Sequence, residues 1–321
     1  MVETGRAPSL HVSPIQPTCS HMPELPQDRL AVGAFYNPHL AEFILEHADL
    51  IDHLAMADPP AADDSFFPAI QQSFPLLLHD YLGQLSDPLS EFALSRAQAL
   101  QERYRGPWVA EHFQCLHTQD RSRSLDYVFP PLYTEEFLDR FCQNAEILRR
   151  AVNAPLVMEN IPGFFSIERA QMSEAEFLRR FFERTGCGFL IDVPHIWLAA
   201  HYKGMDAREY LAGFPLDRVV EIHVAGVEYD RDLRGPWIAP APPSDEILAL
   251  ARCVAERAPE LRAVTLDIFS PSLTAAELEA AMRKTREAFH TRIDVDAGAD
   301  ARPFSRSFTT EITEDHRGNP N

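Results

Sequence analysis

The chain has 321 residues, of which 45% are hydrophobic, and a formal net charge of −19. It can therefore build a large core, and it has no apolar run near the about 20 residues of a membrane-spanning helix. The negative charge excludes a nucleic acid as the expected partner, because phosphate binding needs clustered Lys and Arg. The five cysteines show no paired spacing, which predicts neither a disulfide framework nor a zinc ribbon and favours a cytoplasmic protein.

Short apolar runs alternate with amphipathic segments along the chain. The runs are typical of strands buried on both faces of a parallel sheet, and they lie at 30–35, 50–56, 74–79, 108–112, 155–159, 188–192, 218–223 and 263–268. The amphipathic segments predict helices at 38–47, 89–104, 134–151, 173–185, 206–212, 244–256 and 274–290. Several of them begin with a capping residue followed by acids, as at Thr134, Ser173 and Ser244.

This alternation predicts an α/β fold, a closed (β/α)8 TIM barrel over residues 29–290. Residues 1–28 contain five prolines and no apolar core segment, so we expect a flexible extension there. Residues 291–321 are polar and predict a disordered tail. The amino-terminal residues do not show the pattern of a signal peptide.

Several of the predicted strands finish in a residue that can bind a metal. These residues are His79, Glu159, Asp192, His223 and Asp267, and His195 follows Asp192 by three positions. The carboxyl ends of the strands meet at one face of a TIM barrel, which predicts a convergent site. Imidazoles mixed with carboxylates, and no thiolate, suit iron, manganese or zinc. A carboxylate can bridge two cations, so the site has room for two or three metals, and Asn160 beside Glu159 is placed to orient water, substrate or a second metal.

Five segments of the sequence resemble the sequences of one known family. The segments are 131–137, 156–160, 185–193, 204–211 and 216–226, within an ordered match over about residues 30 to 290. They resemble the multinuclear non-haem iron-dependent oxidative enzymes, and the block from Thr185 to Gly226 is the most specific part. That family is similar in turn to the xylose isomerase and endonuclease IV barrels, so the resemblance implies a xylose isomerase-like TIM barrel.

The resemblance also implies an activity. Family members use two or three iron ions and dioxygen to modify cysteine or other residues of ribosomally made peptides, often with a partner protein that presents the precursor peptide. The matching positions in this chain are His79, Glu111-His112, Glu159-Asn160, Asp192 and His223. Adjacent strand residues point to opposite faces, so we take His112 as the ligand and give Glu111 a catalytic role with Asn160 and Asp230.

The chain also departs from the family pattern. Pro194-His195 stands where the family usually has Asn-Asn, and it looks more like the Asp-x-x-His of the endonuclease IV barrels. Asp267 replaces a glutamate, Lys203 lies where a histidine is usual, and Val227 follows Ala-Gly in place of histidine. The Asp-x-His that the family has further downstream is not found here, and Asp230, Asp232 or Glu228 can stand in for it. The expected metal ligands are thus His79, His112, Glu159, Asp192, His195, His223 and Asp267.

Two other readings of the sequence stay open. The first is a redox-neutral isomerase, epimerase or hydrolase, in which Zn²⁺ or Mn²⁺ polarises a carbonyl or activates water while Glu159 and Asp267 handle protons. The second is a non-catalytic binding protein on a degenerate barrel, which the departures at Lys203 and Val227 allow. We expect five other histidines on loops or helix surfaces, namely His39, His47, His53, His117 and His201. Phe164, Phe165 and Trp197 are expected to pack in the core or to line a pocket.

Overall fold

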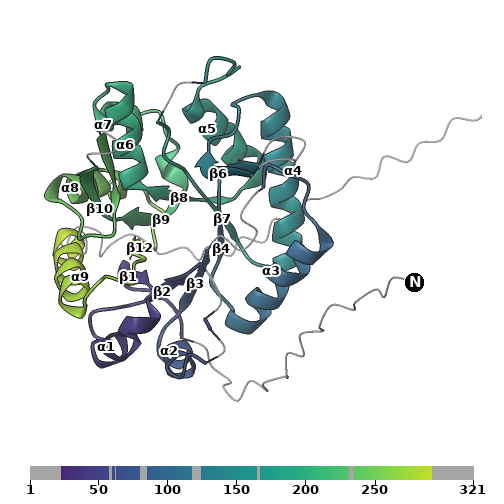
Figure 1. The fold of residues 1–321 in the computed structure, drawn as a ribbon. Helices are drawn as coiled ribbons and strands as arrows, with labels where there is room; N and C mark the ends of the chain where they lie inside the picture. The colour runs from purple at the N-terminus through teal and green to yellow at the C-terminus, as the bar shows by residue number, and fades with distance from the viewer. Residues whose placement is uncertain are drawn as a thin grey trace, which may run out of the picture.

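Eight parallel strands close into a barrel in the computed structural model, which describes residues 23–57, 60–61, 63–79, 85–117, 124–164, 167–230 and 235–290. The strand order is β1-β12-β9-β8-β7-β4-β3-β2, and β1 pairs with both β12 and β2 to close the ring. Figure 1 looks onto this ring. The strands are β1 Ala31–Phe35, β2 Leu54–Met56, β3 Leu76–His79, β4 Val109–His112, β7 Leu156–Glu159, β8 Gly188–Asp192, β9 Val219–Val224 and β12 Ala263–Leu266. The predicted TIM barrel is confirmed.

Helices surround the barrel, and each predicted helical segment is present. The first one is divided between the 3-10 helix η1 Pro38–Leu40 and α1 Ala41–Glu46. The others are α3 Glu91–Tyr104, α4 Glu135–Val152, α5 Glu174–Thr185, α7 Ala207–Leu211, α8 Asp245–Ala255 and α9 Ala275–His290. Along the described parts of the chain, no helix is both long and apolar enough to cross a membrane.

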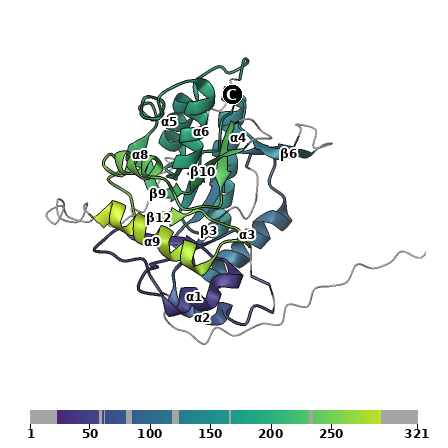
Figure 2. The same cartoon turned by 60° about the vertical axis from the view of Figure 1, so that its left-hand side comes forward.

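Some elements of the structure were not predicted from the sequence. These are two helices, α2 Phe67–Ser73 and α6 Val193–Lys203, the short 3-10 helix η2 Leu216–Arg218, and the two-stranded sheets β5 Cys115–His117 with β6 Ser124–Phe129 and β10 Gly226–Asp230 with β11 Gly235–Ala239. Both small sheets follow barrel strands, β4 and β9, so each extends the chain beyond the carboxyl end of a strand. Figure 2 shows β6 projecting from the body of the barrel.

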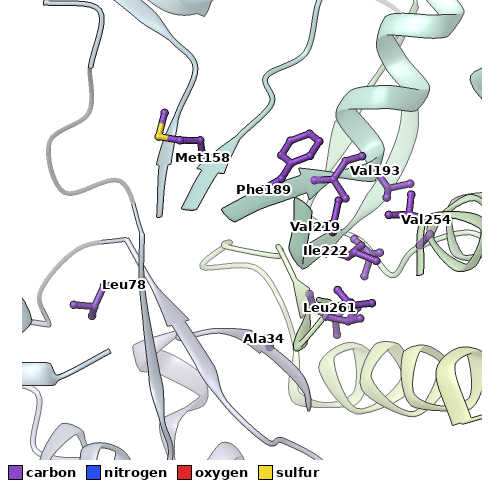
Figure 3. Packing of buried hydrophobic residues seen from close by; sticks show 14 of the residues in the cluster. Ala34, Leu78, Met158, Phe189, Val193, Val219, Ile222, Val254 and Leu261 are labelled. Carbon is purple, nitrogen blue, oxygen red and sulfur yellow. The ribbon is translucent and has the colours of Figure 1, made fainter. Parts of the chain in front are cut away.

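The main hydrophobic core fills the space between the barrel and its helices. Figure 3 shows part of it, where Phe189 of β8 and Ile222 of β9 lie near Val193 of α6 and Val254 of α8. All four side chains are at most 1% exposed. Fully burying a side chain of this kind stabilises a fold by about 1.5–3 kcal/mol, so this layer fixes the helices, and with them the strand ends, in place.

The inside of the barrel holds a second apolar cluster. It consists mainly of small and medium side chains, namely Ala31, Phe35, Ala55, Leu77, Trp108, Ala110, Val157, Leu190, Val220 and Ala263, together with Leu25. Leu25 is 5% exposed, so packed structure begins before the expected boundary at residue 29. The rest of the expected amino-terminal extension, and the expected tail from 291 onward, lie outside the described residues.

Helix α5 offers a direct test of helix capping. The Ser173 hydroxyl accepts a hydrogen bond from the backbone N–H of Glu176, 3.1 Å away. We expect Ser173→Ala to lower the free energy of unfolding by about 1 kcal/mol, because a backbone donor loses its partner. Urea unfolding measures this. The matched control is Ser73→Ala at the exposed end of α2, and equal stability losses in the two variants would contradict the prediction.

Candidate metal centre

The site lies inside the barrel at the carboxyl ends of its strands. Strand register places the predicted ligands at the same level, because His112 pairs with Glu159 and Asp192 pairs with His223. Side chains alternate between the two faces of a strand, so Glu159, His223 and Asp192 point inward while their neighbours join the outer core. Glu159 and Asp192 are each 1% exposed and His223 is 0% exposed.

Glu159 is the centre of the arrangement. One carboxylate oxygen, Oε2, lies 2.6 Å from Nε2 of His79 and 3.2 Å from Nε2 of His112. The other, Oε1, lies 3.6 Å from Nδ1 of His195 and 3.9 Å from Nδ1 of His223. Four imidazoles from four different segments therefore converge on one carboxylate.

Three overlapping groups of side chains have donor atoms within 4.8 Å of one another, close enough to hold a metal ion. The groups are His79–Glu159–His223, Glu159–Asp192–His195 and Asp192–His223–Asp267. Any two groups share one residue. The structure thus brings together all seven predicted ligands, with His112 joining through its contact to Glu159, and metal binding by them stays a prediction.

Helix α6 explains how His195 reaches the centre. Asp192 ends β8 and caps α6, since its Oδ1 accepts a hydrogen bond from the backbone N–H of His195 at 2.6 Å. The side-chain amide of Asn160 holds the backbone of Asp192 from the other side, through contacts of 2.9 and 3.2 Å. Nδ1 of His195 lies 2.8 Å from the carbonyl oxygen of Asn160. A carbonyl only accepts, so this contact puts the proton on Nδ1 and leaves a lone pair on Nε2.

The buried carboxylates create a strong need for positive charge. Burial raises the pKa of Glu159, but the charges of His112 and His223 and the hydrogen bond from His79 outweigh it, so the pKa lies below its usual range. Burial raises the pKa of Asp192 well above its usual value, and the charges of Glu159 and Asp267 raise it further. Two carboxylates so close cannot both be ionised cheaply unless a cation lies between them.

The pKa values of His195 and His223 are shifted in opposite directions. Burial lowers the pKa of His195 to about 4, which keeps this imidazole neutral, as a metal ligand must be. Burial also lowers the pKa of His223, but Glu159, the hydrogen bond with Glu221 and Asp267 raise it to about 10 overall. Nδ1 of His223 is buried without a hydrogen-bond partner among the described residues. A buried nitrogen facing carboxylates is a position that a cation would satisfy, so the donor set fits a divalent metal ion.

Phe35 of β1 forms an apolar wall of the site. Its ring meets His79 and His223 edge to face, with ring centroids 5.6 and 5.7 Å apart. His79 in turn meets His112 edge to face at 4.7 Å. These contacts limit the rotation of the imidazoles and exclude water from one side of the centre.

Other predicted site residues lie elsewhere or outside the description. Glu111 is buried, but it is in register with Met158 of the outer core, so it lies on the face of β4 opposite to His112. Asp230 ends β10, and its side chain lies outside the description, as do Asp232, Phe165 and the side chain of His117. Glu228 is exposed.

The expectation for His53 was wrong. We placed it on a loop or helix surface, but it is 0% exposed and lies inside the barrel just before β2. It belongs to a buried polar layer that the sequence analysis did not identify, together with Trp108, Glu221 and Thr265. Glu221 carried a signal, because a residue two positions before His223 on a strand faces the same way.

A separate pocket of about 260 Å³ opens among the outer helices α6, α7 and α8. Trp197 and His201 of α6, Arg208 of α7 and Glu246 of α8 contribute to its lining. The rings of Trp197 and His201 are stacked, with centroids 5.5 Å apart. None of the seven predicted ligands lines this pocket, so it is distinct from the metal centre.

The fold defines the class of protein first. The barrel is similar to a xylose isomerase domain-containing protein of Salmonella typhimurium LT2, with a TM-score of 0.55, 12% identity, and coverage of 83% of this chain and 99% of that one. It is also similar to 3-keto-D-glucoside 4-epimerase of E. coli in its apo form, with a TM-score of 0.51, 13% identity, and coverage of 81% and 100%. The protein is thus a xylose isomerase-like TIM barrel, and at such low identity the likeness shows the fold alone.

Sequence comparison gives the family. The model of the family described as RiPP precursor modification enzyme MbnB/TglH/ChrH matches residues 42–267, so the chain belongs to this enzyme family. A UPF0276 protein of Rhizobium meliloti (strain 1021) is 29% identical over 239 residues, 71% of this chain and 75% of that one. A UPF0276 protein of Bordetella pertussis is 34% identical over 149 residues, 46% of this chain and about half, 51%, of its own length. The family predicted from the sequence is confirmed.

Proposed function

We propose that the protein is a multinuclear iron enzyme that uses dioxygen to modify a ribosomally made peptide, at a cysteine or at another residue. The observation that carries this proposal is the set of three ligand groups that share Glu159, Asp192 and His223. Shared carboxylates can bridge neighbouring cations and offset their repulsion, which supports a centre of two or three irons. Membership of a family of RiPP precursor modification enzymes supports a peptide substrate.

The donor types favour iron over the alternatives Zn²⁺ and Mn²⁺. His79, Glu159 and His223 form a group of two histidines and one carboxylate, the donor set of many non-haem Fe(II) oxygenases. The second and third groups each combine one histidine with two carboxylates. A single imidazole nitrogen binds one metal at a time, so His223 serves either the first or the third group, and the shared carboxylates carry the connection between metals.

The chain's own residues would bind the metals, hold them apart and keep the centre dry. Glu159 and Asp192 supply negative charge, His195 stays neutral, and Phe35 closes one side. Asn160 holds Asp192 through its amide, so we propose that its role is to position this ligand. When bound, iron supplies the redox chemistry with dioxygen, while the protein supplies geometry and a water-poor pocket. A catalytic role for Asp230 remains part of the proposal, whereas Glu111 lies on the outer face of β4, away from the centre.

The proposed partners are the precursor peptide and a protein that presents it. We propose that the peptide enters at the barrel mouth, because the predicted ligands lie at the carboxyl ends of the strands. The small sheets that follow β4 and β9 leave the barrel at this mouth. The net charge of −19 favours a basic peptide or a basic partner.

The first test is metal analysis of the anaerobically purified protein, with iron, manganese and zinc counted per chain. We expect two or more irons in the wild type and their loss in the double variant Asp192→Ala/His195→Ala, because these residues contribute to two of the three groups. One zinc or manganese per chain, without oxygen consumption after Fe(II) addition, would favour a redox-neutral isomerase, epimerase or hydrolase. Absence of metal in the wild type would refute the metal centre and favour a binding protein.

A further inference from the structure

A fully buried polar layer lies inside the barrel next to the metal centre. Its members are His53, which precedes β2, Trp108, which precedes β4, Glu221 of β9 and Thr265 of β12, and each is at most 4% exposed. The inside of a TIM barrel is usually filled by apolar side chains. A buried carboxylate such as Glu221 is costly unless several donors satisfy it, so the layer calls for a functional reason.

Two members of this layer, Trp108 and Thr265, donate hydrogen bonds to Glu221, and His53 contacts Thr265. Trp108 can only donate, and its Nε1 lies 2.8 Å from Oε2 of Glu221. The Thr265 hydroxyl donates to Oε1 of Glu221 at 2.6 Å. This donation uses the single hydroxyl proton, so Thr265 must accept from Nε2 of His53, 2.9 Å away. Burial lowers the pKa of His53 to about 4, which agrees with a neutral ring that donates through Nε2.

The remaining contact of Glu221 is with the predicted ligand His223. Oε1 of Glu221 lies 3.3 Å from Nε2 of His223, and an ionised carboxylate can only accept. Nε2 must therefore carry a proton, which leaves Nδ1 to bind a metal. Nδ1 is the nitrogen that faces the centre, 3.9 Å from Oε1 of Glu159 and 4.0 Å from Oδ2 of Asp267.

We propose that Glu221 is a positioning residue that fixes the ring orientation and the tautomer of His223, so that Nδ1 is the metal-binding nitrogen. Trp108 and Thr265 hold the Glu221 carboxylate in this role. The proposal rests on the proposed metal centre. Carboxylate partners of this kind orient metal-binding histidines and raise their basicity, and their loss weakens metal binding by about 10–100-fold.

The substitution Glu221→Gln tests this with almost no change of volume. If the new amide keeps its oxygen toward His223, its NH₂ group faces the N–H of Trp108, and two donors then oppose each other. If the amide turns over, its NH₂ group faces Nε2 of His223 and favours the tautomer whose proton sits on Nδ1, where it blocks the metal. Either outcome weakens metal binding, and we expect Fe(II) and Zn²⁺ dissociation constants about 10–100-fold higher than in the wild type.

A second substitution separates positioning from a structural role. Trp108→Phe removes the opposing donor, so in the double variant Glu221→Gln/Trp108→Phe the amide can present its oxygen to His223 without conflict. We expect the double variant to bind metal more tightly than Glu221→Gln alone, although Trp108→Phe alone weakens binding. A residue that only stabilised the barrel would give losses that add, and additive losses would overturn the proposal.

Nitrogen NMR of the histidine rings provides a readout that needs no variant. In the Zn²⁺-loaded wild type we expect His223 to show a protonated Nε2 and a metal-bound Nδ1, and metal on Nε2 would overturn the proposal even if Glu221→Gln does not fold. If Glu221→Gln binds metal as tightly as the wild type does, the positioning role of Glu221 is refuted and the proposed metal centre is not. A wild type that binds neither Fe(II) nor Zn²⁺ refutes the metal centre and this inference with it.

Discussion

Glu159→Gln is expected to remove essentially all tightly bound metal from the protein. Glu159 belongs to two of the three ligand groups, and its carboxylate lies within 3.9 Å of nitrogen atoms of His79, His112, His195 and His223. An amide has the same shape but carries no charge, and its NH₂ group would face the imidazoles. The substitution removes a metal ligand and also the negative charge at the centre of the site. The number of metals per chain should therefore fall from two or more to well below one.

Asp267→Asn is the matched control for this substitution. Asp267 belongs only to the third group, and its side chain is 31% exposed, so solvent can replace it. We expect this variant to keep the metals of the first two groups and to lose at most one. Metal analysis of the two variants, purified side by side under anaerobic conditions, distinguishes the cases. Equal metal content in Glu159→Gln and the wild type would show that Glu159 is not the shared ligand.

Gly33→Ala is expected to destabilise the barrel strongly. A Cβ atom at Gly33 would lie 2.2 Å from the carbonyl oxygen of His53 and 2.6 Å from a carbon of its ring. Residues of β1 and β2 pair at this point, so the methyl group cannot be accommodated without parting the strands or displacing the ring. Overpacking of this kind costs about 3 kcal/mol, which urea unfolding will measure.

Gly33→Ala should also disturb the hydrogen bonds next to the metal centre. A displaced His53 ring loses its hydrogen bond to Thr265, which in turn donates to Glu221. Gly163→Ala is the control, because its nearest neighbour would be the Lys203 amine at 3.4 Å, an ordinary contact. We expect this control to match the wild type within about 0.5 kcal/mol. A Gly33→Ala variant as stable as Gly163→Ala would mean that β1 and β2 can separate without loss.

Much of the fold could be predicted because the burial of each strand and helix leaves a local pattern in the sequence. Strands buried on both faces must be continuously apolar, as in Phe189, Leu190 and Ile191, and helices between them must be amphipathic. The helix α6 was missed because its sequence is mostly apolar, with six of its first eight residues buried, so it shows no amphipathic pattern. Its start signals were present, since Asp192 caps it and Pro194 lies in its first turn.

The small sheets could not be predicted for a different reason. Each one owes its stability to packing on the rest of the protein, because an isolated two-stranded sheet is marginal in water. The β10–β11 sheet is held by contacts such as the hydrogen bond from the Tyr202 hydroxyl to the carbonyl oxygen of Pro236, at 2.9 Å. Such contacts join residues far apart in the sequence and leave no local pattern.

The sequence by itself determined the barrel, the family and the types of residue at the strand ends. These follow from local rules, since a strand that ends in Glu159 or Asp192 delivers a carboxylate wherever the barrel closes. Only the tertiary structure decided that Glu159 is shared by two ligand groups, that Glu111 faces away, and that His53 lies buried beside Thr265. The physical reason is that strand register and barrel closure set which side chains meet, and both depend on the packing of the whole chain rather than on any one segment.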